Sequence, residues 1–286
     1  MPAERSEIIY QPTFGCFVRT AWSILTSPLA GSSLRFVGVF FRTYLLRQYG
    51  VLRPMDAALS VDRAIPFRKQ DLATYWGIFL YPFAVVRFLR RTFGIGTDAE
   101  IRAEFERTSR IYKGASRVFD ETQTTFLCRR QATGAGAALL HLFDRNRNCY
   151  PSLHAAVIGK AYTVAARFIA RSDDTARYEP VREELFRNLV RIMESCYTVK
   201  QHSIRDLAAG FALLTVHEPD FSEAVAERVF DVLFADGSLP EETVREVRLA
   251  ARAEYVDILA RWRSGRYPDI AAVLIGKVGE MKTRLP

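Results

Sequence analysis

The chain has 286 residues, of which 49% are hydrophobic and 25% are charged, so it can bury a substantial core and wholesale disorder is excluded. Forty basic against 32 acidic residues give a net charge of +8, which favours anionic partners such as phosphorylated metabolites or membrane surfaces. Nucleic-acid binding is disfavoured because no dense Lys/Arg block or nucleic-acid fold signature is present. The four cysteines are scattered and form no CxxC pair, which argues against a disulfide framework or a structural zinc site and favours a reducing cytoplasm.

The N-terminal third predicts helices separated by one loop. Residues 1–14 lack the apolar core of a signal peptide. Apolar residues at helical spacing predict a helix over 32–48, whose arginines (Arg35, Arg42, Arg47) form a solvated face or, alternatively, face membrane phosphates. A loop is expected over 52–67. The most apolar stretch, 75–91, is interrupted by Pro82 and carries Arg87; it predicts either a buried core helix or an interfacial helix with arginines toward lipid phosphates.

The sequence pattern also predicts helices over most of the remaining chain. We expect helices near 98–112, 151–171, 178–196, 201–216, 221–235, 240–264 and 268–283, with loops at 133–150 and 171–180 and a turn at 217–220. Alternating strands with hairpin turns are absent from the sequence. The predicted fold class is therefore all-α: a helical core over 1–216 and amphipathic helices over 217–286, which are either an appendage or the outer layer of one bundle.

Residues 147–156, RNCYPSLHAA, open the predicted helix at 151–171. Pro151 and Ser152 suit the first positions of a helix, where a hydroxyl can accept hydrogen bonds from free amides. The same amides, at the positive end of the helix dipole, also form a site for phosphate. From these residues alone, Ser152 can be a plain helix cap or an anion ligand, and the plain cap is favoured because hydroxyl caps are common. His154 would lie in the first helical turn.

A second histidine lies in SCYTVKQHSIRDLAAG, residues 195–210. On a helix His202 and Asp206, four residues apart, share one face, so the carboxylate can orient the imidazole as a nucleophile or base. Taken alone, such a pair is more often a polar contact on a helix surface. Lys200, two residues earlier, is placed to hold an anion.

Together the two segments, N-x-Y-P-S-L-H-A-A and S-x6-H-x3-D-x-x-A-G, resemble the type 2 phosphatidic acid phosphatase superfamily, in particular its inositol phosphorylceramide synthase-like branch. Residues 61–83, VDRAIPFRKQDLATYWGIFLYPF, are similar to the Asp…Ile-Pro-Phe…Tyr segment upstream of the motifs in that branch. The resemblance covers about residues 60–216. It implies an all-α bundle and a metal-independent phosphoryl-transfer site without cofactors.

The resemblance also implies a role for each matching position. His202 would be the nucleophile that becomes phosphorylated, Asp206 would orient it, and His154 would protonate the leaving oxygen. Ser152 and the amides that follow it would hold phosphate oxygens. Position 196 is cysteine where the family usually has an arginine after the serine equivalent to Ser195, and the Lys-x6-Arg-Pro motif is not present as such. The expected phosphate-binding set is therefore completed by Ser195, Lys200, Arg129 and Arg130.

The expected activity is that of a phosphatase or phosphotransferase acting on an amphiphilic phosphate or diphosphate ester, such as a lipid phosphate or a prenyl diphosphate. The alternatives are a prenyl-diphosphate lyase or cyclase that uses the same anion site, and an inert protein that binds a lipid phosphate. A vanadate-dependent haloperoxidase is disfavoured by the short chain and the missing arginine. The expected location is cytoplasmic, with peripheral membrane contact left open, and His141 and His217 are expected to be surface or loop residues.

Overall fold

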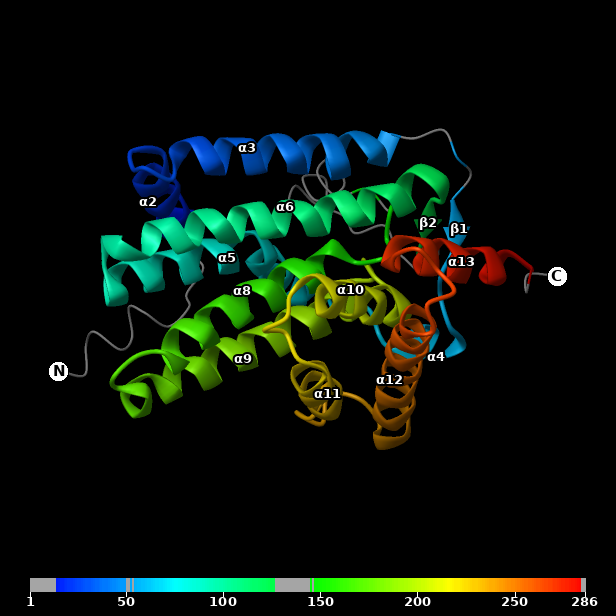
Figure 1. Ribbon diagram of the computed structural model, residues 1–286. Helices are drawn as coiled ribbons and strands as arrows, with labels where there is room; N and C mark the ends of the chain where they lie inside the picture. The colour runs from blue at the N-terminus through cyan, green and yellow to red at the C-terminus, as the bar shows by residue number, and fades with distance from the viewer. Residues whose placement is uncertain (1–13, 50–51, 53, 127–144, 146, 284–286) are drawn as a thin grey trace.

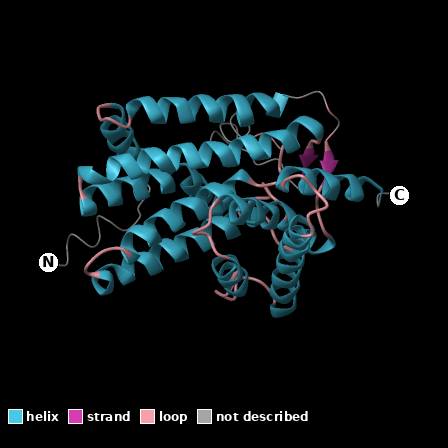
Figure 2. Ribbon diagram, viewed as in Figure 1, coloured by secondary structure: helices cyan, strands magenta, loops and turns pink. Residues whose placement is uncertain are grey.

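The computed structural model describes residues 14–49, 52, 54–126, 145 and 147–283. These residues form helices almost throughout, which confirms the all-α class (Figure 2). Two-residue segments, β1 (Met55–Asp56) and β2 (Thr124–Thr125), pair in parallel. The expected loop at 52–67 contains β1 and the short helix α4 (Ser60–Ala64).

The N-terminal half supplies two long helices and the segments that cover them. Helix α3 packs along α6, and α2 packs against α5 (Figure 1). The helix expected over 32–48 begins earlier and changes its winding after Phe40, where a π-helical and then a 3₁₀ segment continue it. The elements are α2 (Phe14–Leu25), α3 (Ala30–Phe40), η1 (Phe41–Leu45), η2 (Leu46–Tyr49), η3 (Lys69–Asp71), α5 (Leu72–Phe93), η4 (Ile95–Thr97) and α6 (Asp98–Glu121).

The C-terminal half is built around α10, which packs against α8, α12, α6 and α13. In Figure 1 α12 runs across the direction of α3 and α6, at the end of the molecule where α13 also lies. The residues from 217 onward thus form helices that pack on α10 and α6. The elements are α8 (Leu153–Ala170), α9 (Thr175–Thr198), α10 (Ile204–His217), α11 (Glu223–Val232), α12 (Glu241–Arg263) and α13 (Ile270–Thr283).

The expectations at two prolines also need adjustment. Most of the loop expected at 171–180 is helical, because α9 starts at Thr175, where the Asp174 side chain accepts a hydrogen bond from the Arg177 amide, and continues through Pro180. Helix α5 likewise continues through Pro82. It buries one face, including Tyr75, Tyr81 and Val85, as expected of a core helix.

Among the described residues, one helical stretch, Lys69–Phe93, has the length and apolar composition that a membrane crossing requires. The sharply bent pair Val18–Leu25 and Ala30–Tyr49 meets the same requirement when it is taken as one segment. Core helices of soluble proteins can meet it too, so this finding is weak evidence for insertion.

Candidate functional site

The PSLH segment forms the start of α8. Ser152 is the N-cap residue, and its hydroxyl accepts a 3.4 Å hydrogen bond from the Ala155 amide. Ser152 is fully buried and His154, in the first turn, is 7% exposed. Ser152 therefore caps α8, and His154 lies in the first turn, whose amides have no partner within the helix.

The HSIRD segment forms the start of α10 through a capping box. The Ser203 amide donates to Asp206 Oδ2 at 2.7 Å, and the Asp206 amide donates to Ser203 Oγ at 3.2 Å. The same carboxylate oxygen lies 3.6 Å from His202 Nδ1, just beyond hydrogen-bond distance. Asp206 thus fixes the helix start and faces the imidazole at once, but the expected shared helix face is wrong, because α10 begins at Ile204 and His202 precedes its N-cap.

The two helix starts are joined through the main chain. The Ser152 amide donates to the Asp206 carbonyl at 2.8 Å. This contact requires a glycine on α10, because a Cβ built at Gly210 would lie 2.2 Å from the Ser152 carbonyl oxygen and 2.9 Å from Ala155 Cβ. The glycine that ends the D-x-x-A-G motif therefore permits the close approach of α10 to α8.

This approach brings the two histidines into direct contact. His154 Nδ1 and His202 Nε2 are 2.6 Å apart, and both rings are buried. Because His202 Nδ1 faces a carboxylate, the consistent assignment puts its proton on Nδ1 and leaves a lone pair on Nε2. His154 Nδ1 then carries the proton of the contact. One histidine presents a lone pair and the other presents a proton at the same point.

Two buried tyrosines from other helices enclose His154. The ring of Tyr75, on α5, packs edge-on against it at 5.6 Å between centroids, and that of Tyr44, on η1, packs at 6.4 Å. Tyr75 lies in the 61–83 segment singled out by the resemblance. Tyr44 lies outside the region of resemblance, so its place beside His154 could not be foreseen from the motifs.

Lys200 lies close to the helix start but its ammonium points to the main chain. Its Nζ donates to the Asp62 carbonyl at 2.6 Å and lies 5.8 Å from the Phe126 ring centroid. The backbone of Lys200 has φ 59, in the left-handed region. In this arrangement Lys200 positions the segment that precedes His202, and a role as an anion ligand requires its side chain to turn.

Asp62 is a site residue that the motif analysis did not single out. Its carboxylate accepts hydrogen bonds from the Ile204 amide at 2.9 Å and the Leu59 amide at 2.6 Å. Burial raises the pKa of Asp62 to about 7, although these two hydrogen bonds oppose the rise. The VDRAIPF stretch was the signal for it, since Asp62 is the aspartate of that segment.

Of the other predicted phosphate ligands, Ser195 lies within the described residues, whereas Arg129 and Arg130 do not. Ser195 is buried and its hydroxyl donates to the Ile192 carbonyl of its own helix at 2.7 Å, so the structure gives it a local helical partner. The Cys196 carbonyl accepts from the Gln201 and His202 amides at 3.1 and 3.3 Å and thereby closes the turn that presents His202. Arg129 and Arg130 lie outside the described residues, as does His141.

The C-terminal helices contribute a buried carboxylate behind the site. Glu254, on α12, accepts a 3.2 Å hydrogen bond from the hydroxyl of Tyr150, which precedes the PSLH segment. Its other oxygen lies 3.7 Å from Arg205 Nε on α10 and 3.2 Å from Lys277 Nζ on α13. Residues beyond 217 therefore contact both motif segments, a connection that sequence reasoning did not provide.

One group of possible metal ligands lies within the described residues. Single ligand atoms of Cys149, His202 and Asp206 lie within 4.8 Å of one another, and all three residues are buried. A thiolate, an imidazole and a carboxylate are donors that zinc accepts. This group overlaps the histidine pair, so the function of the pair must be tested with and without metal.

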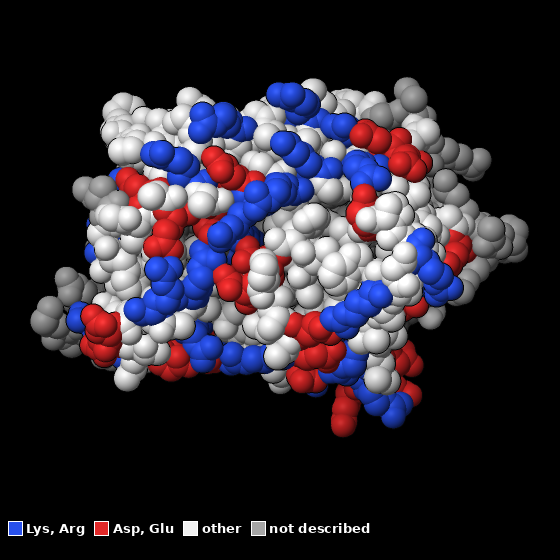
Figure 3. All heavy atoms as spheres, in the orientation of Figure 1, with Lys and Arg blue, Asp and Glu red and all other residues white. Residues whose placement is uncertain are grey.

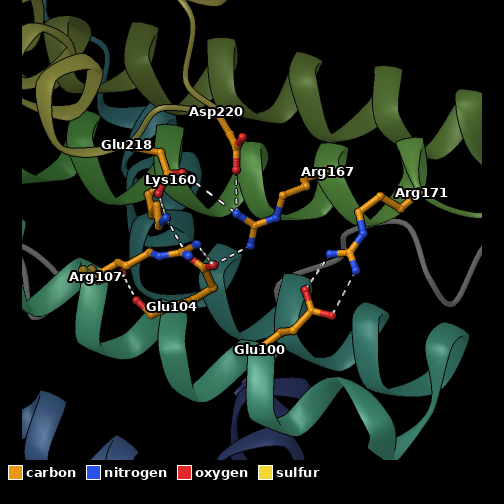
Figure 4. Close-up of polar contacts among 9 residues, drawn as sticks. Glu100, Glu104, Arg107, Lys160, Arg167, Arg171, Glu218 and Asp220 are labelled. Atoms are coloured by element: carbon orange, nitrogen blue, oxygen red, sulfur yellow. Dashed lines mark hydrogen bonds and ion pairs between the residues drawn. The ribbon is translucent and has the colours of Figure 1, made fainter.

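A second polar cluster lies along α8, about 20 Å from His154 by the helical rise to Arg167. Lys160, with its side chain 3% exposed, pairs with Glu218 and, at 2.5 Å, with Glu104 (Figure 4). Burial would raise the pKa of Glu104, but Lys160 and Arg167 outweigh it and hold that pKa below its usual value. Burial lowers the pKa of Lys160.

A cavity of about 550 Å³ opens beside this cluster and is lined by His217 on the last turn of α10 and by basic and acidic side chains of α6 and α8. Figure 3 shows the basic groups as a band across this face with acidic groups beside it. His217 is a partly buried helical residue, not the surface or loop residue expected, and burial together with Arg110 lowers its pKa. Because carboxylates already neutralise much of this charge, the histidine pair remains the better candidate for chemistry.

Comparison of the chain with protein-family models, curated protein sequences and solved structures yields no match. The interpretation of the site therefore rests on its geometry and on the two motifs.

Proposed function

We propose that this protein is a phosphatase or phosphotransferase that acts on amphiphilic phosphate or diphosphate esters through a phosphohistidine. The 2.6 Å contact between His154 Nδ1 and His202 Nε2 carries the proposal, because it places a nucleophilic lone pair and a proton donor at one point. The resemblance of both motifs to the type 2 phosphatidic acid phosphatase superfamily supports the same chemistry and the corresponding helical bundle.

The proposed reaction has two steps, phosphorylation of His202 and transfer of the phosphoryl group to an acceptor. His202 Nε2 attacks phosphorus and the phosphorus–oxygen bond of the ester breaks, while His154 gives its proton to the leaving oxygen. A water molecule or an alcohol then attacks phosphorus and gives its proton to His154, while the phosphorus–nitrogen bond breaks and returns the electron pair to His202 Nε2. The product is phosphate or a new ester. The two rings must separate on substrate binding, because a 2.6 Å gap between nitrogens admits no phosphoryl group.

The surroundings support these roles. Asp206 faces Nδ1 of His202 and stabilises the positive charge that develops on the ring during attack. The amides that open α8 beside Ser152 would hold phosphate oxygens, because the Ser152 hydroxyl caps only one of them and a helix start attracts anions. Amphiphilic esters are the proposed substrates because that class is implied by the resemblance.

A decisive assay measures phosphate and diphosphate release from detergent-dispersed prenyl diphosphates and phosphatidate. We expect His202→Ala to lower the rate by about 10³-fold or more and His154→Ala by about 10²-fold or more. His217→Ala is the matched control, since it removes a partly buried histidine from the far end of α10 and should leave the rate unchanged. Full activity of His202→Ala would refute the proposal.

Two further measurements separate the alternatives. Rapid quenching of wild-type enzyme with radiolabelled substrate should trap an acid-labile, alkali-stable phosphoprotein that His202→Ala does not form. Activity that is lost with a chelator and restored by zinc would instead assign the reaction to a metal held by Cys149, His202 and Asp206.

The aromatic rings beside His154 favour one second candidate, a prenyl-diphosphate lyase or cyclase. Tyr44 and Tyr75 are the kind of side chain that stabilises a carbocation after diphosphate departs. That reaction would release intact diphosphate and a hydrocarbon, whereas the proposed hydrolysis releases phosphate and retains oxygen on the organic product. Mass spectrometry of the organic product distinguishes them.

A further inference from the structure

The first two helices expose apolar side chains at helical spacing. On α2, Val18, Trp22 and Leu25 are 47%, 69% and 49% exposed. On α3, which packs along α6 (Figure 1), and on its continuation the exposed apolar residues follow the same periodicity. They are Leu34, Val37, Phe41 and Leu46. Large exposed apolar residues of the described chain are concentrated here, which marks an interaction surface.

The charge of this surface has a single sign. Residues 14–49 contain four arginines and no aspartate, glutamate or lysine. Arg19, Arg35 and Arg42 are exposed beside the apolar residues, whereas Arg47 pairs with Asp120. An apolar helical face that includes tryptophan and is flanked only by arginine is the composition of a helix that lies in the interface of an anionic bilayer.

A groove between α2 and α5 adds a site of matching charge. It encloses about 270 Å³ and its lining contains Arg19, Arg87, Arg90 and Arg91 and no acidic residue. Arg90 pairs with Asp98 and donates to Ser23 Oγ at 2.7 Å, which holds its guanidinium in place. Thr20 also lines the groove; it is 4% exposed and its hydroxyl has no hydrogen-bond partner among the described residues.

We infer that α2, the outer face of α3 and the end of α5 form a docking surface for an anionic lipid bilayer, with lipid phosphate groups bound in the arginine groove. The apolar residues enter the interface and the arginines meet the phosphates. The parts of this surface on α2 and α3 precede the region of family resemblance. Tyr44, on the inner side of the same chain segment, contacts His154, so the docking surface covers the helices that enclose the histidine pair.

The test measures binding of the full chain to phosphatidylcholine vesicles with and without phosphatidylglycerol. We expect binding to the mixed vesicles only, a blue shift of Trp22 fluorescence that Trp22→Phe removes, and weaker binding at high salt. The double variant Trp22→Glu with Leu34→Glu should abolish binding. Its matched control, Leu249→Glu with Val256→Glu on α12, changes two residues that are 55% and 51% exposed and should bind normally.

The charge contribution is tested separately. Arg19→Gln with Arg91→Gln should weaken binding to the mixed vesicles about 30-fold, because each arginine near an anionic surface contributes roughly a fivefold factor. All of these residues lie on the surface, so the variants should keep the far-ultraviolet spectrum and unfolding midpoint of the wild type.

Three outcomes would overturn the inference. One is equal binding to neutral and anionic vesicles; another is inorganic phosphate that binds the groove while neither vesicle binds. The third is self-association of the chain that Trp22→Glu abolishes, with no vesicle binding, which would assign the surface to a second copy. The inference can fail independently of the proposed function. The docking variants should keep full activity toward a short-chain, water-soluble phosphate ester. If the wild type is inactive toward that ester, the proposed function of the histidine pair is contradicted and the docking surface is not.

Discussion

Gly210→Ala tests whether the close approach of α10 to α8 builds the site. The added methyl group would lie 2.2 Å from the Ser152 carbonyl oxygen, whereas an ordinary carbon–oxygen contact is about 3.3 Å, so the helices must separate by about 1 Å. The obstacle is main chain, which cannot rotate away as a side chain can. The separation also lengthens the 2.8 Å hydrogen bond from the Ser152 amide to the Asp206 carbonyl.

The expected cost follows from three contributions. Overpacking in a closed core costs about 1–3 kcal/mol, and weakening the buried hydrogen bond costs about 1 kcal/mol. Replacing glycine by alanine inside a helix returns about 1 kcal/mol. We therefore expect the free energy of unfolding to fall by about 1–3 kcal/mol. Because the same shift moves His202 away from His154, the phosphatase rate should fall by about 10²-fold.

Urea unfolding and phosphate release are measured on the same preparations. The matched control is Gly279→Ala, an exposed position inside α13 where an added Cβ meets nothing within 4 Å; it should raise stability by about 0.5–1 kcal/mol and leave the rate unchanged. If Gly210→Ala proves as stable and as active as the control, the close approach of the two helix starts is not required and the reasoning from Gly210 fails.

Three further changes probe the buried charges. Lys160→Met should cost about 3–5 kcal/mol in urea unfolding, because it leaves the buried Glu218 with only a 4.0 Å contact to Arg167 and removes one of the partners of Glu104. Arg107→Gln, in the same cluster but 40% exposed, should cost less than about 1 kcal/mol, and equal costs would contradict this. Because the pKa of Asp62 is raised from 3.8 to about 7 on folding, the folded state binds the Asp62 proton more tightly than the unfolded state and is stabilised at low pH. This stabilisation is complete below pH 3.8 and is lost as the pH rises through 7. Asp62→Asn should therefore flatten the fall in the free energy of unfolding between these two pH values. Asp206→Asn should lower the phosphatase rate by about 10²-fold or more, because its amide can donate to Nδ1 of His202 and select the wrong tautomer; an unchanged rate would remove Asp206 from the mechanism.

The helical class and most helix positions followed from the sequence. Apolar residues recur every three to four positions along α9, whereas α8 and α10 are longer apolar runs. The meeting of His154 with His202 could be expected only through the two motifs, because 48 residues separate them and no local signal reports that distance. Where the winding changes, as after Phe40, and where a proline stays inside a helix, as at Pro82, packing overrode local preference.

Other features depended on tertiary structure. Whether Lys200 reaches an anion or a carbonyl is decided by its left-handed backbone and by Asp62, neither of which its own neighbourhood predicts. Glu254 reaches Tyr150 from a helix that begins almost a hundred residues later in the chain. The arginines proposed to complete the phosphate site, Arg129 and Arg130, lie outside the described residues and remain predictions.

The hydrogen bond from the Ser152 amide to the Asp206 carbonyl joins the two motifs without using a side chain. The main chain therefore contributes to the placement of His154 relative to His202. Substitutions at either histidine should change the proposed chemistry and still leave the two helix starts joined. A few side-chain changes around this junction of two helix starts would then be enough to exchange one reaction for another or to retain only binding.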